Sequence, residues 1–441
     1  MSATIDQTLR MEDRLRAMFD LHDGHALNGS NVSLSGIRKK AIADFEALGL
    51  PHRKSEAWKY TPVEKALHKE AQIQVKPAAQ SATEAQIASL LIPDLDVYRV
   101  VFLNGHIQPA LSQLEGLPAK VLVKELHAAS SENAAELNKY FAKYADSAAD
   151  SFIALNTAFA KEGLFVHVGE RALVEKPIHI IHLFDTGENE IVQPRMLFVA
   201  EAGSEVNVIE SFACLSNTNT FVNTVTEWAV SERANVHHYQ IQEFNAESTV
   251  VSTIHAHQST HSFFSTHTTS ISGRMIRNNL TIVPDAEDCE SHLFGLVLGK
   301  ENMHVDNHTL VDHKKPNCFS NELYKNILDD QSVGVFNGKV FVRPDAQKIN
   351  AYQSNKSITL TKNAKMYSKP ELEIYADDVK CSHGATTGQL DEDAMFYLRA
   401  RGIKKEQARA LLLMAFARDV IENIKIEPLK LFIDNKIENK L

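Results

Sequence analysis

The spacing of hydrophobic and polar residues changes twice along this 441-residue chain. Near the N-terminus, apolar residues recur at helical spacing, as in RMEDRLRAMF (10–19) and SGIRKKAIADFEAL (35–48). A further helical pattern lies near 130–162. We therefore predict an N-terminal helical domain over residues 1–95, followed later by a separate helical segment.

The middle of the chain has a different pattern, one of short strands. Runs rich in β-branched and aromatic residues, such as LFVHV (164–168), RMLFVA (195–200) and VGVFNGKVFV (333–342), alternate with turn residues. So long a series favours a solenoid, in which each coil stacks on the last, over a single sandwich. A barrel or a pair of sandwiches remains open, because the sequence has no strict repeat period. The predicted β core spans 96–385, with a helical entry near 130–162.

The C-terminal part is helical again, and we predict a third domain over 386–441. The segment LDEDAMFYLRARG (390–402) starts with Asp391 as a helix N-cap and closes at Gly402. The next segment, KKEQARALLLMAFARDVIENI (404–424), carries an apolar stripe at helical spacing. Four residues of that apolar stripe are Leu412, Leu413, Phe416 and Val420.

Composition and charge exclude several classes of protein. The net charge of −10 leaves no basic excess for binding nucleic acid. The longest apolar run, ALLLMAFA (410–417), is far shorter than the roughly 20 residues that cross a bilayer. The first 20 residues lack the apolar stretch of a signal peptide, and the four cysteines form no CxxC pair. We therefore expect a reduced, cytoplasmic protein that does not enter a membrane.

The motifs of several enzyme classes are missing from the sequence. GLVLGKE (295–301) lacks the Ser or Thr and the glycine spacing of a phosphate-binding loop. There is no GxGxxG after a strand, no HExxH and no GxSxG. We expect a protein that is not itself an enzyme, so that any nucleotide-driven step would belong to a partner.

Histidines are concentrated in one region, with half of the 20 lying between residues 237 and 313. In STIHAHQ (252–258), His255 and His257 would share one strand face, where two imidazoles can ligate zinc, iron or copper. No Cys or carboxylate completes a ligand set nearby in sequence. We therefore favour the alternative that these histidines occupy the polar outside of stacked strands.

The segment DDVKCSHGATTGQL (377–390) carries the most specific candidate chemistry. On a strand, Cys381 and His383 would lie on one face and could offer sulfur and nitrogen to a soft metal. A Cys–His nucleophile pair is less natural, because such pairs usually join residues distant in sequence. The remaining interpretation is a half-buried thiol and a hydrogen-bonded imidazole near the end of the strand region.

These segments resemble one known family, the SufB/SufD proteins of iron–sulfur cluster assembly. The resemblance covers nearly the whole chain and rests on five segments: 49–63, 151–168, 311–328, 332–361 and 369–403. GLPHRKSEAWKYT (49–61) and the sequence Cys-Ser-His-Gly at 381–384 are similar to the SufD branch. The SufB branch is expected to carry an acidic residue beside its histidine.

The resemblance implies a fold and a set of partners. The implied fold is mainly β, a right-handed parallel β-helix core flanked by N-terminal and C-terminal α-helical domains. SufD-type chains pair with a SufB-type paralogue, and each binds one copy of the ATPase SufC. The stripe residues Leu412, Leu413, Phe416 and Val420 would then dock SufC; the alternative is that the stripe closes back on the end of the β-helix of its own chain. Alone, the chain is expected to form a homodimer, because an open sheet edge has to be covered.

The resemblance also assigns roles to the candidate site. It makes His383 a ligand for a nascent cluster at the interface with SufB, and Cys381 the second candidate. Imidazole replaces thiolate in some iron–sulfur centres. The cluster would be transient and shared with SufB, and the isolated chain is expected to hold no cofactor. Whether the complex binds a flavin is left open.

Two other functions compete with this interpretation. A β-helix enzyme acting on polysaccharide would use paired carboxylates, for which Asp377, Asp378, Asp391 and Glu392 are candidates. Their position before and at a helix start suits helix capping equally well. A stand-alone metal-binding protein would use the histidine-rich region instead. We rank both below the assembly scaffold.

Overall fold

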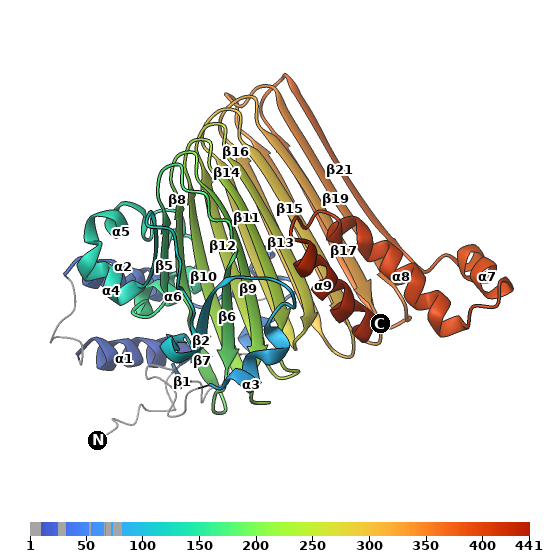
Figure 1. Cartoon of the computed structure of the whole chain (residues 1–441), viewed down its shortest axis with the longest axis horizontal. Coiled ribbons are helices and arrows are strands. Elements are labelled where there is room, and N and C mark those ends of the chain that lie inside the picture. The colour runs from blue at the N-terminus through green and yellow to red at the C-terminus, as the bar shows by residue number, and fades with distance from the viewer. Residues whose placement is uncertain (1–9, 25–31, 53, 66, 68–71, 74–81) are drawn as a thin grey trace.

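Two parallel sheets face each other and form a long solenoid in the computed structural model, which describes residues 10–24, 32–52, 54–65, 67, 72–73 and 82–441 (Figure 1). From β8 to β21, successive strands of the chain alternate between the two sheets. Each coil therefore adds one strand to each sheet. The predicted parallel solenoid is confirmed, and the barrel and the paired sandwiches are excluded.

Sheet A and sheet B are defined by their strands. Sheet A contains, in spatial order, β4 (Val121–Glu125), β5 (Leu164–Val168), β8 (Arg195–Ala200), β10 (Thr220–Val230), β12 (Thr249–Gln258), β14 (Met275–Pro284), β16 (His304–His313), β18 (Val333–Val342) and β20 (Lys365–Ile374); β7 (Glu190–Val192) also pairs with β10, and β1 (Gln72–Ile73) pairs with β7. Sheet B contains β3 (His106–Ile107), β2 (Tyr98–Leu103), β6 (Ile178–Phe184), β9 (Glu205–Cys214), β11 (Asn235–Glu243), β13 (Phe263–Ser272), β15 (Glu290–Gly299), β17 (Phe319–Leu328), β19 (Ile349–Thr359) and β21 (Val379–Gly388).

The coils differ in length, which explains why the sequence shows no strict period. Phe263 pairs with Glu290, 27 residues later, whereas Val333 pairs with Lys365, 32 residues later. The strands themselves keep a nearly constant length, so the variation falls in the turns. Because only the pairing of strands repeats from coil to coil, while the turns vary in length, equivalent residues do not recur at a fixed spacing in the sequence.

The inside of the solenoid changes character along its length. In the early coils the two sheets bury apolar side chains such as Ile180, Phe198 and Val208 between them. In the last coils, buried polar side chains take these places: Glu322, Asn326, Gln353, Asn355 and Ser357. Buried polar groups are stable only when they are hydrogen-bonded to one another, and these form side-chain ladders between coils.

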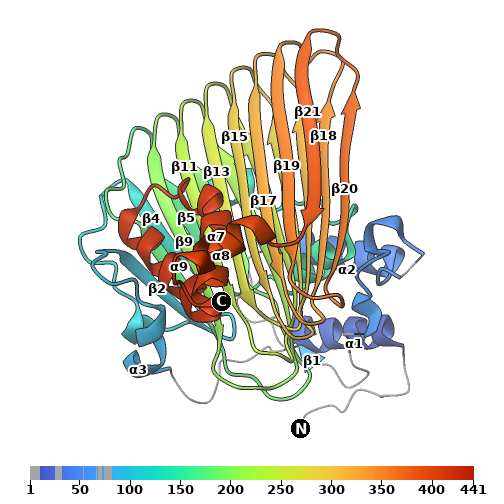
Figure 2. The same ribbon diagram turned by 90° about the vertical axis from the view of Figure 1, so that its right-hand side faces the viewer.

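Helices at the two ends of the chain cover the outer faces of the sheets (Figure 2). Most N-terminal helices and 3-10 turns pack their apolar residues on sheet A: α1 (Met11–Gly24), α2 (Val32–Leu48), η1 (Glu56–Trp58), η2 (Val63–Lys65), α4 (Leu126–Glu132), α5 (Ala134–Tyr140) and α6 (Ser151–Phe159). The short elements α3 (Glu84–Ile87), η3 (Ala88–Leu90) and η4 (Pro109–Leu111) pack on β2 and β6 of sheet B instead. The C-terminal helices are α7 (Glu392–Ala400), α8 (Lys405–Ile421) and α9 (Glu427–Lys440), of which α8 and α9 pack on sheet B.

The helical flanks at both ends are confirmed, and the helical pattern near 130–162 corresponds to α4, α5 and α6. Strands β2 and β4 come before these helices, so the solenoid begins earlier than the first strand-like run in the sequence. Residues 1–9, 25–31, 53, 66, 68–71 and 74–81 of the predicted N-terminal domain lie outside the described residues. Among the described helices, none is both long and apolar enough to span a bilayer.

A buried ion pair fixes the N-terminal segment to sheet A. Arg277 on β14 donates to Asp306 on β16 at 2.6 Å, and both side chains are almost fully buried. Arg277 also donates to the carbonyl of Ala57 at 2.9 Å and lies over the ring of Trp58. Thr61 donates to the same carboxylate. The aromatic segment near residue 58 is therefore held by the solenoid itself.

Candidate functional site

The C-terminal end of the solenoid is open. β20 is the last strand of sheet A and β21 the last strand of sheet B, and no further strand of the described chain pairs with either. Figure 2 shows β20 and β21 at the upper right, as the last strands of the solenoid. Their outer edges present unpaired backbone N–H and C=O groups, which is the usual template for adding another chain.

Cys381 and His383 lie on this last strand and face the mouth of the solenoid interior. β21 pairs in register with β19, so Cys381 lies beside Ala351 and His383 beside Gln353. In-register parallel strands direct paired side chains to the same side. Ala351 and Gln353 are buried between the sheets. Cys381 and His383 therefore share a face, and they extend the buried interior to its open end.

The two side chains differ in exposure. Cys381 is half-buried and packs with Ala351, Leu372 and Val379, whereas His383 is exposed. Burial raises the pKa of the Cys381 thiol, and a backbone hydrogen bond with Ala351 offsets only part of this effect. His383 is accordingly the more accessible donor, and Cys381 is a neutral thiol behind it.

A polar ladder leads inward from His383. Gln353 pairs in register with Glu322 on β17, and its amide nitrogen Nε2 donates to Oε2 of Glu322 at 2.8 Å. Burial raises the pKa of Glu322 to about 7, although Thr309 and Gln353 partly oppose it. Gly338, across the interior, makes room for Gln353, because a Cβ there would lie 2.5 Å from Nε2. Sequence reasoning missed Glu322 and Gln353, which lie far from the Cys-x-His segment in sequence.

Of the four candidate carboxylates near this segment, that of Asp391 has a structural role. Asp391 accepts hydrogen bonds from the backbone N–H groups of Asp393 and Ala394 at 2.9 and 3.0 Å, and so caps α7 as predicted. The carbonyl of Asp378 accepts from the backbone of Lys348. Asp391 is thus a helix cap, and this contact does not favour the paired-carboxylate enzyme.

The apolar stripe of α8 faces inward. Leu413 and Val420 are 1% and 4% exposed and pack with sheet B residues such as Phe294 and Ile327. Leu412 and Phe416 are half-buried. Leu413 and Val420 therefore belong to the core of this chain, and a docking role is left as a prediction for the other two stripe residues.

The most exposed large apolar side chain of the described C-terminal helices lies on α7, although Leu411 on α8 and Leu431 on α9 are also exposed. Phe396 is 73% exposed and Tyr397 55% exposed, and none of the nine described residues of this helix is buried. Figure 1 shows α7 projecting beyond β21. Sequence reasoning missed these two aromatics. The available signal was an adjacent aromatic pair in a short helix, MFYL (395–398), outside the apolar stripe of α8.

The histidine-rich region is part of the solenoid body. Although burial opposes ionisation, hydrogen bonds from His182 and His238 hold the pKa of Glu210 well below its ordinary value. His257 contacts Asp285 at 2.8 Å and stacks on Tyr144. Within the described residues, no three His, Cys, Asp or Glu side chains gather in an arrangement that would hold a metal ion.

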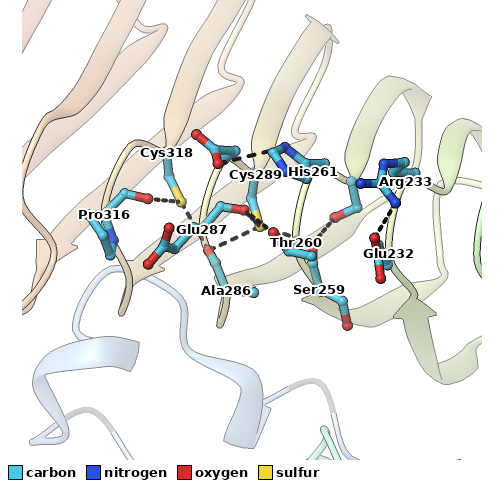
Figure 3. Close-up of polar contacts among 12 residues, drawn as sticks. Glu232, Arg233, Ser259, Thr260, His261, Ala286, Glu287, Cys289, Pro316 and Cys318 are labelled. Carbon is cyan, nitrogen blue, oxygen red and sulfur yellow. Dashed lines mark hydrogen bonds and ion pairs between the residues drawn. The ribbon is translucent and has the colours of Figure 1, made fainter.

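Two of the other cysteines form a ladder at one corner of the solenoid (Figure 3). Cys289 and Cys318 precede the paired residues Glu290 and Phe319, and both are buried. Their thiols donate to the same carbonyl oxygen, that of Ala286, at 3.3 and 3.2 Å. They stabilise the turn, and Cys381 is left as the cysteine nearest the open end.

The geometry defines a class: a parallel β-solenoid with helices on both faces and a Cys-x-His pair at its open end. Comparison with known proteins defines the family. Residues 182–416 match the SufBD core domain of SUF-system iron–sulfur cluster assembly, and residues 10–180 match the SufBD N-terminal region. The chain belongs to the SufBD family of iron–sulfur cluster assembly proteins, as the sequence predicted.

Individual relatives support the SufD-type resemblance. The iron–sulfur cluster assembly protein SufD of Escherichia coli is 30% identical, over 95% of both chains. An iron–sulfur cluster assembly SufBD family protein of Synechocystis is 30% identical over 92% of this chain and 90% of its own. The chloroplast protein ABCI7 of Arabidopsis thaliana is 27% identical over 89% and 83%.

Proposed function

We propose that this chain is the scaffold subunit, without an ATPase motif of its own, of a three-component complex that assembles iron–sulfur clusters. Its open end pairs with a SufB-type paralogue, and the nascent cluster lies between them, within reach of His383. The observation that carries the proposal is the position of His383. It is an exposed imidazole on the last strand of an unpaired sheet edge, where a second chain would add.

The cluster is the cargo of this site, and the chain supplies part of its ligand set. His383 offers an imidazole nitrogen and Cys381 a sulfur from the same face of β21. Clusters are usually held by four protein ligands, so the paralogue would contribute the others. Ligands divided between two chains let the site open when the chains move, and ATP binding by the third subunit is the source of such movement.

The ATPase subunit would dock on the C-terminal helices. The exposed face of α7 provides most of the surface, with Phe396 and Tyr397 as its aromatic residues, and the half-buried Leu412 and Phe416 of α8 would extend it. Exposed aromatic side chains of this size are typical anchors of protein interfaces. The buried partners Leu413 and Val420 would hold α8 in place beneath them.

Without its paralogue, the chain would cover the same edge with a second copy of itself and form a homodimer. Four free thiols in the chain are consistent with a reduced compartment, and we place the protein in the cytoplasm. Nothing in the site selects for or against a flavin in the assembled complex.

Coexpression tests the proposal as a whole. The chain is produced with a SufB-type paralogue and a SufC-type ATPase, purified without oxygen, and analysed for iron, sulfide and visible absorption. The proposal predicts a stable three-component complex that carries cluster, and little iron on the chain alone. A chain that neither copurifies with the other two subunits nor changes their cluster content would overturn it.

A further inference from the structure

The ladder behind His383 contains a buried hydrogen-bond acceptor that is not used. Gln353 is 3% exposed, and its Nε2 is occupied by the carboxylate of Glu322. The other atom of the amide, Oε1, is buried and has no hydrogen-bond partner among the described residues. A buried oxygen of this kind is unfavourable unless an N–H or O–H reaches it.

The in-register neighbours of Gln353 limit what can reach that oxygen. Glu322 lies on one side, on β17, and His383 lies on the other, on β21. The carboxyl group of Glu322 already accepts from Nε2, at the other end of the Gln353 amide, whereas a neutral imidazole carries one N–H that can reach Oε1. His383 is exposed in the middle of β21, the last strand of its sheet, so no neighbouring coil of the described chain holds its ring away from the interior.

We propose that Glu322 and Gln353 are positioning residues for His383. The carboxyl group of Glu322 fixes the orientation of the Gln353 amide, with nitrogen inward and oxygen outward. Oε1 of Gln353 then accepts the N–H of the His383 ring. This contact selects one tautomer and directs the lone pair of the other ring nitrogen toward the open end, where iron would bind.

The role in cluster binding rests on the proposed function, but the hydrogen bond does not. Histidines that ligate metals usually donate their second ring N–H to a carboxylate or a carbonyl oxygen, which orients the ring. Here the side-chain amide of Gln353 would accept that N–H, and the carboxyl group of Glu322 would in turn hold the amide. Gly338 contributes by leaving the space in which the amide of Gln353 lies.

The chain contains a matched control two residues along the same strand. Asn355 is fully buried on the same face of β19 and accepts a hydrogen bond from Asn326 at 2.9 Å. Its in-register neighbour on β21, however, is Ala385. Asn355→Leu therefore disrupts a buried polar ladder as Gln353→Leu does, but the ladder that it disrupts does not lead to His383.

The test is an NMR measurement on the isolated, ¹⁵N-histidine-labelled chain at neutral pH. An imidazole N–H that exchanges slowly enough to be observed is expected for His383, assigned by its loss in His383→Ala. The signal should disappear in Gln353→Leu and Glu322→Leu. It should persist in Asn355→Leu, and also in Glu322→Gln, because the new glutamine side chain can still accept the hydrogen bond from Gln353. If Gln353→Leu does not fold, Gln353→Met, of similar length, takes its place.

Three results would overturn the proposal. The N–H signal of His383 could persist in the Gln353 variant, it could be lost in Asn355→Leu as well, or it could be absent from the wild type. In the three-subunit complex, Gln353→Leu should lower cluster content about 10-fold, the usual effect of removing such a contact. Wild-type cluster content in His383→Ala would instead refute the proposed function, while the NMR result on the isolated chain would stand.

Discussion

His383 stands in register with Gln353, yet Gln353 is buried and His383 is exposed. The two residues occupy equivalent places on successive coils, so the difference arises only because the solenoid ends after β21. A coil that would have covered His383 is absent from the described chain, and the proposed site exists at that position for this reason. The same termination leaves the sheet edges that a partner would use.

Glu322 should make stability depend on pH. Its pKa is raised by burial to about 7 in the folded chain, from an ordinary value of 4.5. Between these values the folded chain keeps a proton that the unfolded chain has released, so stability falls as pH rises from 4.5 to 7. The full loss is about 3 kcal/mol. Glu322→Gln should remove this loss, and urea denaturation at pH 5 and pH 8 measures it.

The control for that experiment is Glu115→Gln, which changes an exposed glutamate in a turn. It should leave the pH dependence of the wild type unchanged. If Glu322→Gln and the wild type lose the same stability between pH 5 and pH 8, the carboxyl group of Glu322 is not protonated in the folded chain.

The two aromatics of α7 and the buried residues of α8 should respond differently to substitution. Changing both Phe396 and Tyr397 to Ser should lower affinity for the ATPase subunit more than 10-fold, because exposed aromatics of this kind dominate binding. It should shift stability by only about 0.5 kcal/mol. Leu413→Ala should instead destabilise the chain by about 2–5 kcal/mol. Binding is measured by surface plasmon resonance and stability by thermal unfolding.

Equal binding by the wild type and the α7 double variant would remove these aromatics from the interface. Leu412→Ser and Phe416→Ser, made separately, then test the two half-buried residues of the α8 stripe as docking residues.

Asp306 should be required to hold the N-terminal segment. Asp306→Ala leaves the buried guanidinium of Arg277 without its counter-charge, which typically costs about 3–5 kcal/mol. Limited proteolysis near Trp58 should become faster. The double change Arg277→Met with Asp306→Leu removes both charges and should recover much of the stability. Unchanged denaturation of Asp306→Ala would show that the ion pair does not fix this segment.

The free edge at β21 should control self-association. Thr386 is exposed on this strand, and Thr386→Lys would place a positive charge at the edge of each copy. Sedimentation should show the wild type as a dimer and the variant shifted toward the monomer. Ser131→Lys, on α4 at the other end of the solenoid, should remain dimeric. Equal dimerisation of both variants would place the contact elsewhere.

The sequence was sufficient for the order of the helical and strand-rich regions and for local features. The period of the helices, the strand-rich middle and the cap at Asp391 all depend on neighbouring residues, and each is present in the structure. The common face of Cys381 and His383 likewise follows from the two-residue period of a strand.

Contacts between coils could not be predicted in this way. Glu322, Gln353 and His383 are about 30 residues apart, and the varying coil length hides their register. The apolar stripe of α8 was visible in sequence, but whether it faced a partner or sheet B depended on where the helix packs. Leu413 is buried for that reason, whereas the aromatics of α7, outside any stripe, are exposed.

The most direct test of the central claim is the cluster content of the three-subunit complex, purified without oxygen, with His383→Ala. We predict at least about a 10-fold loss of iron and sulfide per complex, with normal copurification. Ser382→Ala, on the opposite face of the same strand, should keep the wild-type content. Wild-type iron and sulfide in the His383→Ala complex would contradict the assignment of this imidazole to the cluster.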